Sequence, residues 1–442
     1  MTFQNLNLIP QLLHSLQVKG YEVPTPIQHK AIPHILEGKD IIGSAQTGTG
    51  KTAAFALPIL QLLFTAKDKN QRGIKTLILA PTRELAQQIS DSFRDYGRGL
   101  HLKHTVIYGG VSQRPQTDAL RNGTDIVIAT PGRLLDLMNQ GYVRLDLVKF
   151  FVLDEVDRML DMGFINDIKK IITKIPQKRQ TIFFSATMPA EIKKLADTLL
   201  HQPVIVQTAP ASSAAVTVKQ YVYFVDKGNK RELLKNFLAE NPKHHLLIFT
   251  RTKRGADKLV KSLAADGVKA ESIHGDKSQG ARQRALAQFK TRKINMLVAT
   301  DVASRGLDIT DISHVINFDL PEEAEVYIHR IGRTGRAGAA GTAISYCAQD
   351  ERNIFRDIQR LVKNGIEILK TPALAHSEQP KPVHHRPKQH EHSSSHRTEH
   401  HSEKSTSQSS SHGNRNERKF VPRKKKWHGR WQGKRSSHPP QH

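Results

Sequence analysis

Short aliphatic runs alternate with longer helical patterns along the first 370 residues of the chain. The runs read IIGSA, TLILA, DIVIA, FFVLD and TIFFS, followed by LLIF, NMLVAT, VINFD and TAISY. This alternation predicts an α/β fold with parallel strands and helical crossovers. The most apolar stretch, AAFALPILQLLF (Ala53 to Phe64), contains Pro58 and Gln61 and is shorter than the ~18 apolar residues of a membrane span. We expect it to form a buried helix.

A small, polar segment without apolar periodicity separates TIFFS from LLIF. This segment, residues 208–217, has the composition of a linker, and it predicts two α/β domains at residues 1–207 and 218–370. One large continuous sheet is the alternative, which the linker composition disfavours. Beyond residue 370 Ser, His, Pro, Lys and Arg dominate and no Leu or Ile follows Leu374. We therefore expect residues 371–442 to be a disordered, basic tail rich in His and Ser.

The charge balance points to a polyanionic partner. The chain has 67 Lys and Arg against 41 Asp and Glu, a formal net charge of +26. The tail holds 15 Lys and Arg against 5 Asp and Glu, so both parts of the chain are basic. Such an excess favours nucleic acid, because binding phosphates releases counterions. A protein that is basic without such a partner is the alternative.

Cysteine content and the N-terminal residues predict a cytoplasmic protein. Cys347 is the only cysteine, so no internal disulfide can form, which fits a reducing compartment. The first residues, MTFQNLNLIPQLLHSL, lack the basic start and apolar run of a signal peptide. We expect neither export nor membrane insertion.

A glycine-rich loop predicts a phosphate site. AQTGTGKT (Ala45 to Thr52) follows the run DIIGS and precedes a helical pattern. In such a loop, backbone amides face phosphate oxygens, Lys51 adds positive charge and the Thr52 hydroxyl can bind Mg²⁺. The common pattern has glycine where this chain has Ala45, and a glycine turn beside a surface lysine is the alternative. The order of strand, loop and helix favours the phosphate site.

Carboxylates at the end of FFVL predict a metal site. Asp154, Glu155 and Asp157 form DEVD. Mg²⁺ prefers one or two carboxylates with substrate phosphates and water, so Asp154 suits the metal and Glu155 can polarise an attacking water. An acidic helix start is the alternative, and it weakens beside a phosphate loop.

The segment HRIGRTGR (His329 to Arg336) gathers arginines in the second domain. Arginines that face a nucleotide across a domain gap can stabilise charge on a transferring phosphoryl group. Taken alone, the segment could equally be a solvated basic turn.

Together these motifs resemble the DEAD-box ATP-dependent RNA helicases of superfamily two. The motifs that carry the resemblance are, in order, GYEVPTPIQ, AQTGTGKT, PTRELAQQ, GG, TPGRL, DEVD, SAT, HGDKSQGAR, ATDVASRGLDI and HRIGRTGR. They span most of the chain outside the tail. Their amino-acid sequences are most similar to those of bacterial members with a basic C-terminal extension. The resemblance implies two tandem RecA-like domains, an N-terminal ATP-binding domain and a C-terminal helicase domain.

The resemblance also implies the ATP site. Lys51, Asp154, Glu155, Arg333 and Arg336 would be catalytic, with Thr52 and Asp154 holding magnesium. Gln28 would read the adenine edge. The other residues implied to contact ATP are Phe3, Tyr21, Gly48, Thr49, Gly50, Lys51, Thr52 and Asp308. Phe3 or Tyr21 could instead be a hydrophobic staple of the first helix. The family has Ala where this chain has Val156, an apolar exchange that should leave the carboxylates in place.

Coupling and RNA-binding residues follow from the same resemblance. Asp157 would pair with Ser185, Thr187 or His329 and link hydrolysis to domain closure. The residues implied to hold RNA are Pro81, Thr82, Arg83, Gly110, Thr130, Pro131, Gly132, Arg133, Gln279, Arg282, Thr300, Asp301, Arg305 and Gly306. Contacts of this type follow the RNA backbone and 2′-hydroxyls, so little sequence specificity is expected. Structural turns are the alternative for the glycine pairs.

The implied function is ATP-dependent, local and non-processive unwinding of RNA duplexes, with remodelling of RNA–protein complexes in ribosome assembly or RNA decay. An ATP-gated RNA clamp with little unwinding is the main alternative, and a DNA helicase or translocase is another. A small-molecule kinase would leave the motifs of the second domain unused.

In the tail, Trp427 and Trp431 lie among lysines and arginines, a pattern typical of a sequence-tolerant RNA tether. The alternative is a solubilising charged tail.

Overall fold

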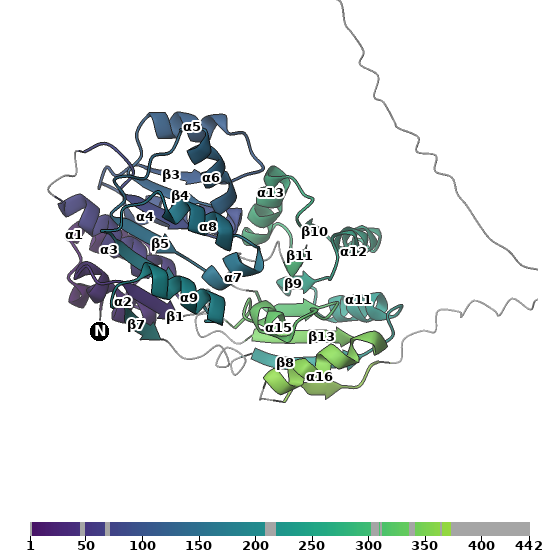
Figure 1. The fold of residues 1–442 in the computed structure, drawn as a ribbon. Helices are drawn as coiled ribbons and strands as arrows, with labels where there is room; N and C mark the ends of the chain where they lie inside the picture. Colours follow the sequence, from purple (N-terminus) through teal and green to yellow (C-terminus); the bar gives the residue numbers. More distant parts are fainter. Residues whose placement is uncertain are drawn as a thin grey trace, which may run out of the picture. The chain divides into compact units, whose positions relative to one another are not determined.

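The computed structural model describes residues 2–44, 49–66, 71–207, 218–301, 309, 312–335, 341–362 and 365–372 (Figure 1). Two seven-stranded sheets lie within these residues, and their paired strands run parallel. The prediction of two parallel-sheet domains is confirmed, and the alternative of one continuous sheet is wrong. Both sheets belong to one compact unit, residues 1–377. The expected linker, and the expected tail beyond residue 372, lie outside the described residues.

The first sheet, with its helices, is called lobe 1 below. Its strand order is β3-β4-β2-β5-β6-β1-β7. The strands are β1 (Ile41–Ser44), β2 (Thr76–Leu79), β3 (His104–Ile107), β4 (Ile126–Ala129), β5 (Phe150–Leu153), β6 (Gln180–Phe184) and β7 (Val204–Gln207). The helices are η1 (Phe3–Leu6), α1 (Pro10–Val18), α2 (Pro26–Leu36), α3 (Lys51–Thr65), α4 (Arg83–Tyr96), α5 (Arg114–Arg121), α6 (Pro131–Asn139), α7 (Val156–Asp161), α8 (Ile165–Ile172) and α9 (Ala190–Leu199).

The second sheet, with its helices, is called lobe 2. Its strand order is β10-β11-β9-β12-β13-β8-β14. The strands are β8 (Val218–Phe224), β9 (Leu246–Phe249), β10 (Ala270–Ile273), β11 (Met296–Ala299), β12 (His314–Asn317), β13 (Gly341–Cys347) and β14 (Glu367–Leu369). The helices are α11 (Lys230–Glu240), α12 (Lys253–Ala265), α13 (Gln279–Lys290), α15 (Ala324–Ile331), η2 (Gln349–Glu351) and α16 (Arg352–Leu361).

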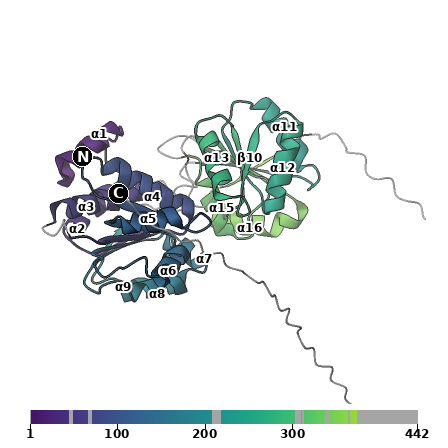
Figure 2. The same ribbon diagram turned by 90° about the horizontal axis from the view of Figure 1, so that it is seen from above.

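Helices cover both faces of each sheet, which explains why the central strands are apolar throughout. In lobe 1, α1 to α4 pack in one core cluster, and α6 to α9 pack in another across the sheet (Figure 2). Neighbouring strand residues divide between the clusters: Ile78 joins the first, whereas Leu77 and Leu79 join the second. A strand buried on both faces loses the alternation of a half-exposed strand. In such a sheet, loops at the carboxyl ends of the strands form the binding crevice.

Five strands, β3, β7, β8, β10 and β14, lie outside the predicted runs. Four of them are at sheet edges, and β8 lies next to an edge. Edge strands have fewer neighbours and keep polar or exposed side chains, as AESI of β10 and the 64% exposed Ile205 of β7 show. Apolar runs therefore identify the centre of each sheet and miss its rim.

The buried helix expected over Ala53 to Phe64 is confirmed as α3. It runs through Pro58, and most of its side chains are buried against the sheet and α2. Among the described residues, every helix is too short or too polar to cross a bilayer.

Two stacked histidines in lobe 2 predict a pH-dependent stability. His314, at the start of β12, stacks on His244 with ring centroids 4.3 Å apart and also contacts Phe237. Burial, reinforced by the neighbouring His244, lowers the pKa of His314 to about 4 from 6.5. The unfolded chain therefore binds more protons between these values, and the free energy of unfolding should fall as pH falls from about 6.5 toward 4. Because the ring is only half buried, we expect a loss of about 1 kcal/mol at pH 5 relative to pH 7.

Urea unfolding of the His314→Gln variant at both pH values tests this expectation. The variant should lose part of the wild-type pH dependence, whereas His201→Gln, at an exposed position, should keep all of it. An unchanged pH dependence in His314→Gln would contradict the assignment.

Candidate active site

The phosphate-loop lysine begins α3, the helix that follows β1 along the chain. Lys51 is the first residue of α3 and is 6% exposed, and Thr52 follows it. Gly50 caps the helix with φ 91°, a left-handed conformation that favours glycine, and a Cβ there would lie 2.4 Å from Gln28 Nε2. Thr49 is also described, whereas Gly48 lies outside the described residues.

Gln28 connects the first helices to this loop. Its Oε1 accepts a hydrogen bond from the Thr25 backbone N–H at 2.9 Å, and its Nε2 donates to the Gly50 carbonyl at 3.1 Å. These two bonds use only one of the two hydrogens on Nε2. Phe3 is 4% exposed within the apolar core, whereas Tyr21 is 41% exposed. Adenine stacking by either ring stays a prediction.

Two buried carboxylates follow β5, and each faces a cation of this chain. Lys51 Nζ lies 3.6 Å from Asp154 Oδ1, and Arg158 Nη1 donates to Glu155 Oε2 at 2.5 Å. Burial raises the pKa of Asp154 to about 6, against the opposing effect of Lys51. Asp154 Oδ1 has no hydrogen-bond partner among the described residues, since 3.6 Å is too long for such a bond. This buried carboxylate oxygen and the hydroxyl of Thr52, the residue that follows Lys51, are a donor set that fits a magnesium ion.

Asp157 holds the SAT segment after β6. Its Oδ2 accepts hydrogen bonds from the Ala186 N–H at 3.1 Å and from the Thr187 N–H at 3.0 Å. Ser185 Oγ accepts from the Asp157 N–H at 3.2 Å and donates to the Thr187 carbonyl at 2.7 Å. The structure therefore brings together Asp157, Ser185 and Thr187 of the expected coupling set.

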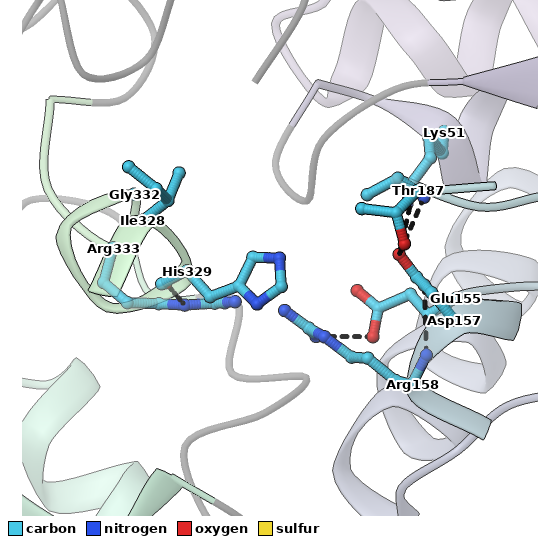
Figure 3. A pocket seen from close by; sticks show the side chains of 10 residues that line it. Lys51, Glu155, Asp157, Arg158, Thr187, Ile328, His329, Gly332 and Arg333 are labelled. Atoms are coloured by element: carbon cyan, nitrogen blue, oxygen red, sulfur yellow. Dashed lines mark hydrogen bonds and ion pairs between the residues drawn. The ribbon is translucent and has the colours of Figure 1, made fainter. Parts of the chain in front are cut away.

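A small cavity of about 50 Å³ gathers catalytic candidates from both lobes (Figure 3). Lys51, Glu155 and Arg158 line it from lobe 1, and His329 and Arg333 line it from α15 and the turn that follows. Burial, and next Arg158, lower the pKa of His329 to about 4, so its ring is neutral at pH 7. Arg333 is 4% exposed. Arg336 and Asp308 lie outside the described residues.

The RNA-binding candidates of lobe 1 follow the carboxyl ends of three strands. Pro81, Thr82 and Arg83 come after β2, Gly110 comes after β3, and Thr130, Pro131, Gly132 and Arg133 come after β4. Thr82 caps α4, since its Oγ1 accepts from the Leu85 N–H at 3.2 Å. Gly110 has φ 77°, and a Cβ there would lie 2.1 Å from Arg83 Nη1. Only glycine lets the arginine lie this close to the chain.

The corresponding residues of lobe 2 begin α13 and follow β11. Gln279 Nε2 donates to Glu84 Oε1 at 3.0 Å, and Arg282 Nη2 lies 3.0 Å from Glu84 Oε2. Thr300 and Asp301 follow β11, while Arg305 and Gly306 lie outside the described residues. The candidates from the two lobes thus meet around Glu84.

Two family models match the chain: the DEAD/DEAH box helicase model over residues 25–195 and the helicase conserved C-terminal domain model over residues 229–338. The chain is also 43% identical over 372 residues to the RNA helicase CrhR of Synechocystis sp., a match that covers 84% of this chain and 75% of CrhR. The chain belongs to the DEAD-box ATP-dependent RNA helicases. It is therefore an RNA-dependent ATP hydrolase of the helicase class.

Another bacterial DEAD-box relative and a solved structure support this family assignment. CshA of Bacillus subtilis is 42% identical over 374 residues, which covers 85% of this chain and 75% of CshA. The structure of S. cerevisiae Dbp5 bound to RNA and ADP BeF3 superposes with a TM-score of 0.74 at 29% identity, and the match covers 84% of this chain and 96% of that chain. The two sheets are thus the tandem RecA-like domains of a DEAD-box helicase.

Three residues that contact the site of this DEAD-box helicase were missing from the sequence prediction. Arg158 pairs with Glu155, Glu84 binds Gln279 and Arg282, and Arg330 forms two bonds to Asp301. Each lies inside or directly beside a quoted motif, which was the available signal. Nothing in the motifs distinguishes a charged residue that faces a ligand from one that holds another side chain.

Proposed function

We propose that this DEAD-box helicase binds ATP and RNA jointly and couples ATP hydrolysis to local, non-processive unwinding of RNA duplexes and remodelling of RNA–protein complexes. The observation that carries the proposal is the cavity lined by Lys51 and Glu155 of lobe 1 and by His329 and Arg333 of lobe 2. Neither lobe holds the whole set, so hydrolysis should depend on both.

Each residue of the ATP site has a role that its chemistry supports. Lys51 and the amides of Thr49 and Gly50, with Gly48, would bind the phosphates, and Gln28 would hold the adenine edge. Glu155 would orient the attacking water and accept its proton, for which its carboxylate must exchange Arg158 for water. Arg333 and Arg336 would stabilise the charge that develops on the γ-phosphoryl group.

Thr52 and Asp154 would hold the magnesium ion. When bound, Mg²⁺ neutralises phosphate charge and orients the triphosphate. Asp154 supports this role because its buried oxygen has an electrostatic partner in Lys51 and no hydrogen bond among the described residues. Asp157 and its hydrogen bonds to the SAT segment would transmit the state of the nucleotide site to the rest of lobe 1.

The RNA groove would run over the carboxyl ends of the strands in both lobes. Dbp5 bound to RNA and ADP BeF3 has the same fold, which supports RNA as the partner of this chain. Arginine side chains, hydroxyls and glycine amides in the groove would bind phosphates and 2′-hydroxyls instead of base edges. Arg83 and Arg282 would contribute charge there, and Glu84 would keep Arg282 and Gln279 in position.

Phosphate release by the full chain, measured with and without RNA, tests the coupling. We expect RNA to raise the hydrolysis rate and to tighten ATP binding by about 5- to 150-fold, the usual range of coupling between sites. An equal rate with and without RNA would refute joint binding. A strand-displacement assay on a short duplex then separates unwinding from the clamp alternative, and a deoxyribose strand in place of RNA separates an RNA enzyme from a DNA enzyme.

The basic C-terminal residues supply a further prediction. We expect deletion of residues 371–442 to weaken RNA affinity and to flatten its dependence on salt, because fewer phosphates are then neutralised. Filter binding at several salt concentrations measures both effects, and the double variant Trp427→Ala/Trp431→Ala isolates the contribution of stacking. Identical binding by the full and shortened chains would show that these residues only solubilise the protein.

The cellular role we propose is ribosome assembly or RNA decay in the cytoplasm. Its support is the resemblance to bacterial DEAD-box helicases and the basic charge of the chain. Crosslinking the protein to cellular RNA and sequencing the captured fragments would identify the target. A capture free of both ribosomal precursors and messenger RNA would argue against this role.

A further inference from the structure

Lobe 2 contains a second cavity, remote from the ATP and RNA residues of that lobe. It has a volume of about 430 Å³ and lies where α11, α12 and the segment before β11 meet. Met296 lines it at the first residue of β11, whereas Thr300, an RNA candidate, follows the last residue of that strand. The two residues are about 13 Å apart along the strand, at its opposite ends. We call this site the lysine-rimmed cavity.

The floor of the lysine-rimmed cavity is apolar. Leu238, Leu263, Ile294 and Met296 line it, and each is less than 10% exposed because it also belongs to the core of lobe 2. Ala239 lies at the exposed mouth. A cavity of this size with an apolar floor can take one large aliphatic or aromatic side chain.

The rim carries positive charge. Lys235, Lys269 and Lys293 are exposed and line the cavity, together with a single carboxylate, Asp266. Asp266 is already paired with Arg231 at 3.0 Å and with Lys235 at 3.3 Å, and the Arg231 hydrogen bond is the main cause that lowers its pKa. Lys269 and Lys293 form no ion pair within the described part of the chain. Two lysines are therefore available to an acidic ligand.

Stabilisation of helix ends does not account for these lysines. A cation that offsets the helix dipole belongs in the last turn of its helix. The last turns of α11 and α12 contain no basic residue, and Lys269 and Lys293 lie in the connections beyond α12 and α13. Their common feature is instead the cavity that they border.

We propose that the lysine-rimmed cavity docks an acidic segment of another protein, which inserts one large apolar side chain over Leu238 and Met296. Carboxylates that flank this side chain would pair with Lys269 and Lys293. The carbonyl groups that end α11 and α12 would accept hydrogen bonds from the backbone of the segment. Binding here leaves the ATP and RNA residues accessible, so the segment would recruit the helicase to a protein partner.

The charge and composition of the lining select this occupant over two others. Residues 371–442 of this chain carry 15 Lys and Arg against 5 Asp and Glu, so the rim repels them. RNA would find neither an aromatic side chain for stacking nor an arginine among the lining residues.

Selection of random short peptides displayed on phage against the full-length protein tests the proposal. We expect enrichment of peptides rich in Asp and Glu around a Phe, Trp, Leu or Met. Their affinity, measured by fluorescence anisotropy, should fall with added salt and by about tenfold or more in the double variant Lys269→Glu/Lys293→Glu. Ala239→Trp, which fills the mouth, should reduce binding without a change of charge.

Matched variants keep the proposal open to refutation. Lys219→Glu/Lys258→Glu makes the same change of charge at exposed positions outside the cavity and should retain peptide affinity. RNA-stimulated ATP hydrolysis should be preserved in all three variants, so a failure of peptide binding is distinct from a failure of the proposed function. Failure to enrich acidic peptides, or equal binding by Lys269→Glu/Lys293→Glu and the wild type, would overturn the proposal. Weaker RNA binding by Lys269→Glu/Lys293→Glu, combined with a failure to enrich acidic peptides, would also overturn the proposal. It would assign the two lysines to RNA binding.

Discussion

Replacement of Glu155 by glutamine is expected to slow RNA-stimulated ATP hydrolysis by about a hundredfold to ten-thousandfold, the usual contribution of a general base. The amide has nearly the same shape as the carboxylate but cannot accept the proton of the attacking water. Glu155 is 3% exposed and lies beside Lys51 and Arg333 in the cavity that both lobes line. Because these neighbours stay in place, ATP and RNA binding should persist, and the variant should stay on RNA while ATP is present.

The control is Asp167→Asn, the same carboxylate-to-amide change in α8 of lobe 1, which should hydrolyse ATP at the wild-type rate. Phosphate release and RNA anisotropy in the presence of ATP provide the two measurements. If Glu155→Gln hydrolyses ATP as fast as the wild type, another group activates the water. If it loses RNA binding as well, the residue has a structural role.

Replacement of Arg330 by methionine is expected to lower the free energy of unfolding by about 3 kcal/mol or more, the cost of removing one partner of a buried ion pair. Arg330 is 2% exposed and holds both carboxylate oxygens of Asp301, at 2.6 and 2.8 Å. It also donates to Asn317 Oδ1 at 3.2 Å and to the Asp319 carbonyl at 2.6 Å. Methionine fills similar space but donates no hydrogen bond to these acceptors, of which Asn317 is fully buried.

Arg360→Met is the matched control, because Arg360 is 79% exposed and pairs with Asp357 on the surface of α16. Its loss should cost less than about 1 kcal/mol. Chemical denaturation of both variants compares the two costs, and equal shifts would show that the Arg330 network contributes nothing special. Since Asp301 is next to Thr300, Arg330→Met should also reduce RNA-stimulated hydrolysis under conditions where it stays folded.

Two arginines of HRIGRTGR have different surroundings that the motif itself does not predict. The motif predicted positive charge near the nucleotide, and Arg333 does line the cavity between the lobes. Arg330, only three positions earlier, is buried within lobe 2 and stabilises the strand ends. Both residues have the same side chain in the same motif, but Arg330 lies in α15 and Arg333 in the turn that follows it.

The sequence by itself determined the class of fold, the central strands of both sheets and the ATP-dependent RNA helicase family. Those strands are buried on both faces, so each appears in the sequence as a continuous apolar run. The motifs directly follow these runs, so they too can be read from the sequence. Tertiary structure alone decided the edge strands, the pairing of Glu155 with Arg158, the meeting of Glu84 with Gln279 and Arg282, and the lysine-rimmed cavity. These features join residues from separate elements, and a charged side chain shows its partner only when packing brings the two within a few ångströms.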